Sequence, residues 1–197
     1  MVDPFTAILE TIERDWVGQH TRSVAELDDA CRLLFSGKIF ISHTAADSLW
    51  CKTHVVRLVA AAFGYDSFFF LSSADTKHKV ETHRVAVTFA FKYTKTIIIA
   101  LSQRSVRSNW ARLEASWAVE QKHPIIICRI DDTDPAVLHP DLGKRRWFDF
   151  KARPPRTSAD FSRDVAVGEK EFTSFLGKKE FRADIDREAQ WAAMGRL

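Results

Sequence analysis

The sequence predicts an α/β fold of the flavodoxin-like type, a three-layer sandwich in which helices cover both faces of a five-stranded parallel sheet. Short apolar runs of strand length alternate with helix-like segments of about ten to fifteen residues, which is the pattern of βαβ units. The strand-like runs, such as Thr96–Leu101, are apolar almost throughout, as expected of strands buried on both faces. In such a sheet the ligand crevice lies outside the carboxyl ends of the strands.

Two helix-start signals precede the first strand and predict N-terminal helices. The pair Asp3-Pro4 places an N-cap aspartate before a proline suited to the first helical position. Ser23–Glu26 fits the S-x-x-E capping box, and apolar residues then recur at helical spacing along Val24–Leu34. Gly37 follows, in the position where a glycine commonly ends a helix.

The remaining elements are expected in alternation. Strands are predicted at 38–42, 66–71, 96–101, 124–130 and 147–150. Helices are predicted at 47–63, 80–93 and 110–122, with loops or polar turns at 72–79, 102–109 and 131–146. After the prolines at 154–155 we expect a charged helical tail that ends near Trp191.

The chain has 197 residues, which is enough for one domain with a full hydrophobic core and modest appendages. We expect an N-terminal helical extension (1–37), a domain core (38–150) and a C-terminal helical segment packed on or extending that core (151–197). The net charge of +3 is too small, and its signs too interspersed, to argue for a nucleic-acid groove or an anionic membrane surface. The densest basic run, Lys144–Arg146, fits a solvated face better than a phosphate track.

Three cysteines, Cys31, Cys51 and Cys128, lie far apart and without CxxC spacing. They predict neither a zinc site nor a disulfide framework, and Cys128 fits a small buried hydrophobe. Acidic residues such as Glu10 interrupt the N-terminal apolar residues, so this segment does not resemble a signal peptide. No apolar run has the length of a membrane span, and a cytoplasmic location is expected.

Several familiar motifs are missing from the sequence. It contains no G-x-G-x-x-G, no P-loop and no G-x-S-x-G, which argues against an ordinary dehydrogenase, a P-loop enzyme and the usual serine hydrolase. Asp131, Asp132 and Asp134 could be read as a metal cluster, but a solvated loop is the favoured interpretation. His43 and His78 lie on expected crevice loops, where a lone histidine is more often structural than a ligand contact.

Trp110 and Glu114 are the strongest candidate site residues. At positions i and i+4 they share one face of the predicted helix, and Glu114 lies near the positive end of the helix dipole, where we expect its carboxylate to stay ionised. An aromatic ring beside a fixed carboxylate suits a nucleotide or a pyridinium ring. The alternative is that Trp110 packs on the core and Glu114 is a surface residue, and on spacing alone this alternative is the commoner one. Trp117 is expected in the core.

Two segments resemble boxes of the TIR domain, in the form common among bacterial members. Phe40–Asp47 (FISHTAAD) resembles the first box, a strand followed by a small polar loop and an aspartate. Ala100–Glu114 resembles the later S…S-x-W-x-x-x-E box. With the strands around them in the family's order, the resemblance covers Lys38–Phe150.

The resemblance implies an enzyme. Many bacterial TIR domains are NAD⁺ glycohydrolases or cyclases, as in anti-phage defence systems such as Thoeris, and they release nicotinamide with ADP-ribose or a cyclic ADP-ribose. Their essential glutamate matches Glu114, their accompanying aromatic residue matches Trp110, and the loop that lines their NAD pocket matches Ser42, His43, Thr44 and Ala45. NAD⁺ is then the substrate, with no further cofactor and no metal.

The resemblance also implies partners, and here the sequence departs from the family pattern. We expect a homo-oligomer formed through TIR–TIR contacts, a protein activator or downstream effector, and no direct contact with nucleic acid or membrane. The loop at 72–79 lacks the glycine and bulky residue that many members carry there, and Phe70 stands where an acidic residue is frequent. In the family this loop helps to complete the site of a neighbouring protomer.

Two alternatives to the NAD⁺-cleaving enzyme therefore remain. One is an adaptor that assembles through TIR–TIR contacts without turnover, and the departures at Phe70 and 72–79 favour it. The other is a different nucleoside-processing enzyme on a similar sheet, such as a deoxyribosyltransferase-like protein.

Overall fold

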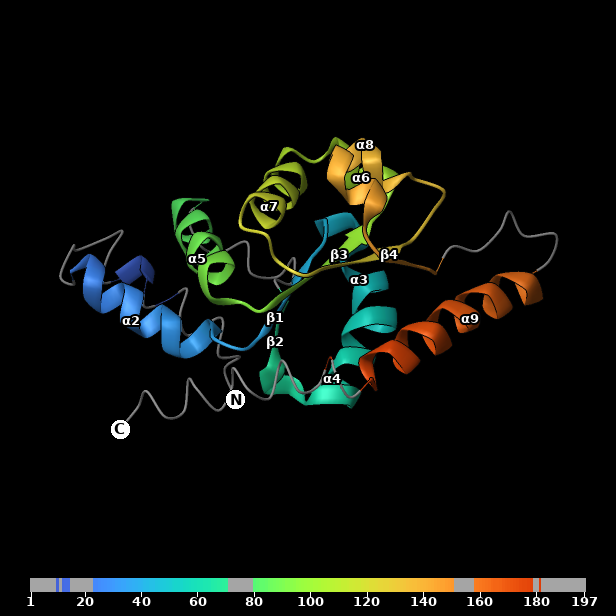
Figure 1. Ribbon diagram of the computed structural model, residues 1–197, viewed down its shortest axis with the longest axis horizontal. Coiled ribbons are helices and arrows are strands. Elements are labelled where there is room, and N and C mark those ends of the chain that lie inside the picture. Colours follow the sequence, from blue (N-terminus) through green and yellow to red (C-terminus); the bar gives the residue numbers. More distant parts are fainter. Residues whose placement is uncertain are drawn as a thin grey trace.

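Five parallel strands form one sheet in the order β2-β1-β3-β4-β5 (Figure 1). The computed structural model describes Glu10 and residues 12–14, 23–70, 80–150, 158–178 and 181. The strands are β1 (Ile39–Ser42), β2 (Phe68–Phe70), β3 (Thr96–Leu101), β4 (Ile125–Arg129) and β5 (Trp147–Asp149). All four neighbouring pairs are parallel, so the predicted flavodoxin-like α/β architecture is confirmed.

Helices connect the strands and cover both faces of the sheet. The α-helices are α2 (Val24–Phe35), α3 (Ser48–Cys51), α4 (Arg57–Phe63), α5 (Val80–Tyr93), α6 (Gln103–Arg107), α7 (Asn109–Glu120), α8 (Pro135–Leu138) and α9 (Ser158–Leu176). Shorter turns are the 3₁₀ segments η2 (Ala45–Asp47), η4 (Tyr65–Ser67) and η6 (Pro140–Lys144) and the π-helical turn η3 (Lys52–Val56).

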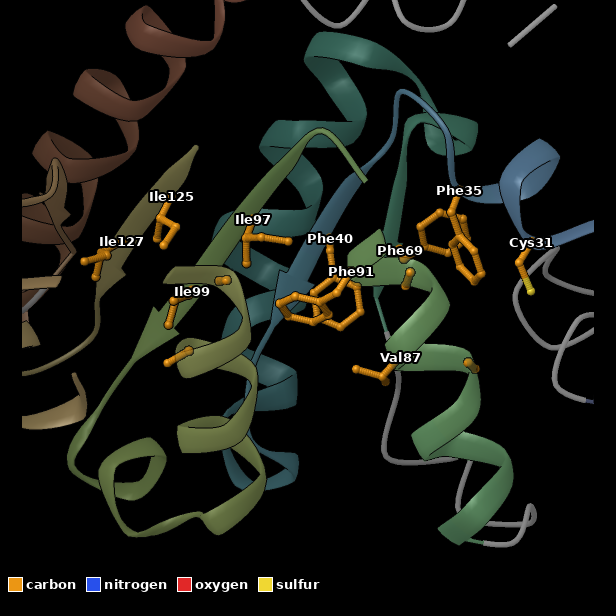
Figure 2. Close-up of a cluster of buried hydrophobic side chains, with 14 of the residues drawn as sticks. Cys31, Phe35, Phe40, Phe69, Val87, Phe91, Ile97, Ile99, Ile125 and Ile127 are labelled. Atoms are coloured by element: carbon orange, nitrogen blue, oxygen red, sulfur yellow. The ribbon is translucent and has the colours of Figure 1, made fainter. Parts of the chain in front are cut away.

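Alternate residues of each strand serve two separate cores. On one face Phe40, Ile97 and Ile99 pack with Phe91 of α5 and with apolar residues of α2 and α7 (Figure 2). On the other face the intervening residues, such as Ile98, pack against α3, η3, α4 and α9. Because both faces are covered, every residue of β1 and β3 is buried, which explains why the strands carry continuous apolar runs.

Helix α2 belongs to the first of these cores. Ser23 and Glu26 form the predicted capping box at its start, and Gly37, with a φ of 73°, follows its end. Leu27 and Phe35 are buried in the same cluster as the sheet residues, and the Phe35 ring meets Phe69 of β2 at 4.5 Å between centroids.

Helix α9 packs on the edge strand β5. A Cβ added to Gly168 would lie 2.2 Å from the carbonyl oxygen of Asp149, so the helix backbone approaches the strand backbone at this glycine. Phe172 inserts its ring against Phe148 and Phe150. Glu169 accepts a hydrogen bond from Arg57, which ties α9 to α4.

Several boundaries differ from those predicted from the sequence. Strand β2 begins at Phe68 rather than at residue 66, because Gly64, with a φ of 88°, is followed by the 3₁₀ turn η4. The segment 47–63 is helical but divided, with a π-helical turn in its middle. The expected polar turn at 102–109 contains the helix α6, because Ser102 and Ser105 form a local capping box. The predictions at Asp3-Pro4, 72–79 and beyond 181 lie outside the described residues.

Candidate active site

The loops after β1 and β3 lie side by side at the carboxyl edge of the sheet. Strand β1 is hydrogen-bonded to β2 on one side and to β3 on the other, so the chain changes direction across the sheet at this strand. In an open parallel sheet such a switch point is where the connections diverge to opposite faces and leave a crevice. The predicted site residues come from these two loops and from the helix that follows them.

Ser42 and Glu114 meet directly at this switch point. Ser42 is the last residue of β1, and its Oγ donates a hydrogen bond of 2.5 Å to Oε2 of Glu114 on α7. Both residues are only 3% exposed. A hydroxyl bonded to a carboxylate forms a short and comparatively strong hydrogen bond. Glu114 is therefore not a surface helix residue, and the alternative that placed it on the surface is wrong.

Burial changes the protonation of Glu114. Loss of solvation raises the pKa of the Glu114 carboxyl to about 7, while the hydrogen bonds of Ser42 and Trp110 act in the opposite direction. The expectation that the helix dipole keeps this carboxylate fully ionised is wrong near neutral pH. The desolvation of a fully buried carboxylate outweighs the attraction of the positive helix end.

Trp110 combines the two roles that the sequence left open. It lies in the first turn of α7, which Ser108 caps by accepting a hydrogen bond from the Ala111 amide. Its ring is half-buried against the first core and meets Trp117 edge-on at 6.5 Å. Its side chain also forms a hydrogen bond that lowers the pKa of Glu114. Trp110 thus packs on the core and contacts the candidate carboxylate, and Trp117 packs on the core as predicted.

The other residues predicted in the loop after β1 point to different neighbours. The His43 ring stacks on Phe70 of β2, with centroids 4.1 Å apart and planes 11° from parallel. Thr44 donates a hydrogen bond to Asp47, and Ala45 is exposed at the start of η2. Ser42 is thus the member of this loop whose contact with Glu114 is established. His78 lies outside the described residues.

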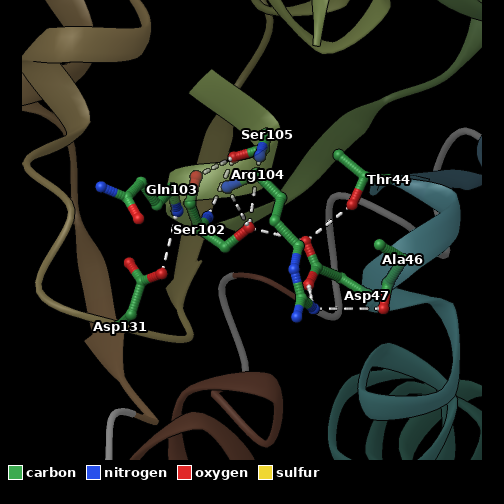
Figure 3. Close-up of polar contacts among 8 residues, drawn as sticks. All are labelled: Thr44, Ala46, Asp47, Ser102, Gln103, Arg104, Ser105 and Asp131. Carbon is green, nitrogen blue, oxygen red and sulfur yellow. Dashed lines mark hydrogen bonds and ion pairs between the residues drawn. The ribbon is translucent and has the colours of Figure 1, made fainter. Parts of the chain in front are cut away.

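Asp47 is a buried residue that the sequence reasoning did not single out. It is 3% exposed, and its carboxylate accepts hydrogen bonds from Thr44, Ser102 and Arg104, at 2.7, 2.6 and 3.1 Å (Figure 3). Asp47 ends the first box, and Ser102 follows a strand, but these residues are 55 positions apart. Nothing in the spacing of either motif signals that the two side chains meet.

After β4, Asp131 and Asp134 form hydrogen bonds with backbone amides. Asp131 accepts hydrogen bonds from the amides of Gln103 and Thr133, and Asp134 caps α8. No group of three metal-binding side chains gathers within the described ranges. The backbone hydrogen bonds of Asp131 and Asp134 agree with the interpretation of this segment as a loop that ends at Pro135.

The three cysteines are buried and unsuited to act as nucleophiles. Burial raises the pKa of Cys31 to about 12 and raises the pKa values of Cys51 and Cys128 as well. A thiol with a raised pKa carries little of the reactive thiolate. Cys128 is the buried hydrophobe that the sequence predicts.

The basic run at Lys144–Arg146 lies away from Glu114. All three side chains are exposed, and Arg146 places its guanidinium over the rings of Phe148 and Phe175. Of the three, Arg146 lines an open groove of about 680 Å³ between β5 and α9, at the opposite edge of the sheet from β2. This groove is separate from the switch point at β1.

Comparison with known proteins agrees with this arrangement. A family model described as the TIR domain matches residues 39–165, from the start of β1 into α9 and over more than half of the chain. No curated protein matches the chain. Among the helices in the described part of the chain, none has both the length and the apolar character needed to cross a bilayer.

Proposed function

Because the chain belongs to the TIR domain family, we propose that it cleaves NAD⁺, releasing nicotinamide and producing ADP-ribose or a cyclic ADP-ribose. The observation that carries this proposal is the buried Glu114 carboxylate, which contacts Ser42 and Trp110 at the switch point of the sheet. NAD⁺ is the substrate, and the proposed chemistry needs neither a metal nor a further cofactor.

One carboxylate is sufficient for this chemistry. Glycosidases ordinarily use a second carboxyl group to protonate the leaving oxygen. Nicotinamide leaves NAD⁺ as a neutral molecule, because the pyridinium nitrogen already bears the positive charge, so no general acid is required. The ionised Glu114 would hold ribose hydroxyls and stabilise the oxocarbenium-like transition state, and its burial strengthens that electrostatic interaction.

The neighbours of Glu114 suit this role. The hydrogen bond from Ser42 fixes the orientation of the carboxylate, so little reorganisation is needed as positive charge develops on the ribose. Trp110 offers a half-buried aromatic ring beside it, and an indole ring attracts a flat cation such as a pyridinium. Water would accept the ribosyl group in hydrolysis, and an atom of the same nucleotide would accept it in cyclisation.

The setting of the reaction is part of the same proposal. We place the protein in the cytoplasm as an anti-phage signalling enzyme that works as a homo-oligomer through TIR–TIR contacts. A protein activator or a downstream effector completes the proposed system. NAD⁺, rather than nucleic acid or a membrane, is the proposed direct ligand.

The test is to incubate concentrated protein with NAD⁺ and to separate the products by chromatography. We expect nicotinamide release by the wild type and its loss, by about a thousandfold, in Glu114→Gln. Glu120→Gln makes the same chemical change at an exposed position of α7 and should keep full activity. Persistent nicotinamide release by Glu114→Gln would refute the assigned role. The second product distinguishes hydrolysis from cyclisation.

A second candidate function is an adaptor that assembles without turnover. The stacking of Phe70 on His43 favours it, because this places a ring where the family frequently carries an acidic residue. An adaptor would show concentration-dependent self-association by light scattering, with no nicotinamide release at any concentration. The deoxyribosyltransferase-like alternative gains no support from the family match.

A further inference from the structure

Arg104 places its guanidinium beside the loop that follows β1. It lies in the first turn of α6, directly after β3, and its side chain is 67% exposed. Its Nη1 nonetheless donates to Oδ1 of Asp47 at 3.1 Å and lies 3.4 Å from the carbonyl oxygen of Ala46 (Figure 3). The guanidinium is therefore held against the loop that follows β1 while remaining open to solvent.

Asp47 is well suited to hold this guanidinium in place. Its second oxygen, Oδ2, accepts hydrogen bonds from the hydroxyls of Thr44 and Ser102, so the buried carboxylate cannot rotate freely. Ser102 also caps α6, the helix that carries Arg104. Within the described residues the Arg104 guanidinium makes no other hydrogen bond, so Nε and Nη2 retain N–H groups for an incoming anion.

The loop after β1 provides one residue to each of two contacts. Ser42 at its start contacts Glu114, and Asp47 at its end contacts Arg104. In a nicotinamide dinucleotide, the ribose that bears nicotinamide is joined at its other end, through C5′, to the pyrophosphate. For a substrate whose reacting ribose lies at Glu114, Arg104 is the guanidinium held at the other end of the loop from the Ser42–Glu114 contact.

We propose that Arg104 binds the pyrophosphate of the substrate and so determines the preference for a dinucleotide over a phosphate-free nicotinamide riboside, with Asp47 as its positioning residue. The planar guanidinium fork matches two phosphate oxygens, and charge-assisted hydrogen bonds of this kind are the stronger ones. This inference rests on the proposed NAD⁺ cleavage, to which it adds a basis for substrate selection.

The first test compares two substrates. Arg104→Gln should raise the KM for NAD⁺ by about 10- to 100-fold with little change in kcat, because one charge-assisted contact to the substrate is lost. The kcat/KM for nicotinamide riboside, which carries no phosphate, should stay unchanged. Arg107→Gln removes the same charge from an exposed position of the same helix and should leave both substrates unaffected.

The second test examines the role of Asp47. Asp47→Asn keeps the size of the side chain and removes the charge that holds Arg104, so it should raise the KM for NAD⁺ and spare nicotinamide riboside. The double variant of Asp47→Asn and Arg104→Gln should be no worse than Arg104→Gln alone, because both changes remove one shared interaction. Circular dichroism melting curves identify a variant that fails to fold.

A measurement of ligand binding tests the role of Arg104 without depending on turnover. Isothermal titration calorimetry with ADP-ribose should show about tenfold or greater weakening in Arg104→Gln, and no weakening in Arg107→Gln. Equal affinity for ADP-ribose in the wild type and Arg104→Gln would overturn the proposal, as would equal loss of kcat/KM for both substrates. Weaker binding by Arg104→Gln with no cleavage by the wild type would retain Arg104 as the anion contact and reject the proposed reaction.

Discussion

At the Glu114 carboxylate, burial and hydrogen bonding act on the pKa in opposite directions. Burial is the larger influence, so the pKa rises to about 7. A buried carboxylate stabilises a neighbouring cation strongly, but it lowers the stability of the folded protein once it ionises.

Glu114 should make the stability of the folded chain depend on pH. The folded-state pKa of Glu114 lies above its ordinary value of 4.5, so below about pH 4.5 this group costs no stability. As the pH rises towards 7 the unfolded chain ionises first, and unfolding becomes easier by about 3 kcal/mol. Glu114→Gln should therefore raise the free energy of unfolding at pH 8 by about this amount, and by almost nothing at pH 4. Urea titrations at both pH values measure the difference, and an equal effect at both would contradict the raised pKa.

The ionisation of Glu114 should also set the pH dependence of the proposed NAD⁺ cleavage. If the ionised Glu114 stabilises the transition state, kcat/KM for NAD⁺ should fall as the pH drops through about 7. Ser42→Ala removes a hydrogen bond that lowers this pKa, so the acidic limb of the pH–rate profile should move to higher pH. Ser116→Ala removes a hydroxyl from α7 itself, the helix that carries Glu114, and should not move the acidic limb. An unshifted limb in Ser42→Ala would show that Ser42 does not control the ionisation.

Part of the candidate site could be predicted from local spacing in the sequence. Trp110 and Glu114 follow from helical spacing, since residues at i and i+4 share a face whatever the rest of the fold does. Asp47 and Arg104 do not, because their contact depends on how the loops after β1 and β3 approach each other. The burial of Glu114, and hence its raised pKa, likewise comes from neighbours distant in sequence.

Among the elements, α9 and β5 are joined by an unusually close contact. Gly168 lets the helix backbone approach the carbonyl of Asp149, and Phe172 fills the space beside Phe148 and Phe150. Glu169 adds an ion pair to Arg57. Burial raises the pKa of Glu169, but the hydrogen bonds with His54 and Arg57 together outweigh it and hold the pKa below its ordinary value. The C-terminal helix is therefore fitted to the sheet edge at a defined position.

This contact predicts a sharp difference between two glycines of the C-terminal segment. In Gly168→Ala the new Cβ would lie 2.2 Å from the backbone oxygen of Asp149, so the helix must shift, at a cost of about 1–3 kcal/mol or more in unfolding free energy. Gly177→Ala meets atoms no closer than 3.5 Å and should be nearly neutral. Chemical denaturation of both variants tests this. Equal free energies of unfolding for Gly168→Ala and Gly177→Ala would mean that α9 does not approach β5 so closely in solution.

Element positions were largely predictable, while their internal details were not. The strand Thr96–Leu101 and the helix Val80–Tyr93 have the predicted bounds because their residue patterns are local. The helix α6 was missed because five polar-rich residues carry no apolar periodicity, and only the Ser102–Ser105 capping box marks it.

In the molecule as a whole, α2 and the sheet share one hydrophobic core. The sequence predicts this helix but not its partner, because its apolar stripe could pack on this domain or on another subunit. Phe35 lies against Phe69 and within the cluster that includes Phe91 (Figure 2). The segment before β1 thus contributes to the stability of the domain.

This shared core predicts cooperative unfolding. Phe35→Ala should lower the free energy of unfolding by about 3–5 kcal/mol, as expected for a fully buried phenylalanine, while leaving a single transition. Val24→Ala, at an exposed position of the same helix, should cost well under 1 kcal/mol. Urea unfolding followed by both circular dichroism and tryptophan fluorescence tests this, and separate transitions for α2 and the sheet would contradict it.

The sequence by itself determined the alternation of strands and helices, the caps of α2, and the placing of Trp110 and Glu114 on one helical face. These features depend on residues within one or two turns of each other, where periodicity and capping chemistry act directly. Only the tertiary structure decided that Ser42 hydrogen-bonds to Glu114, that Asp47 pairs with Arg104, and that α9 approaches β5 at Gly168. Such contacts join residues 72, 57 and 19 positions apart, and they exist only once sheet order and packing bring those segments together.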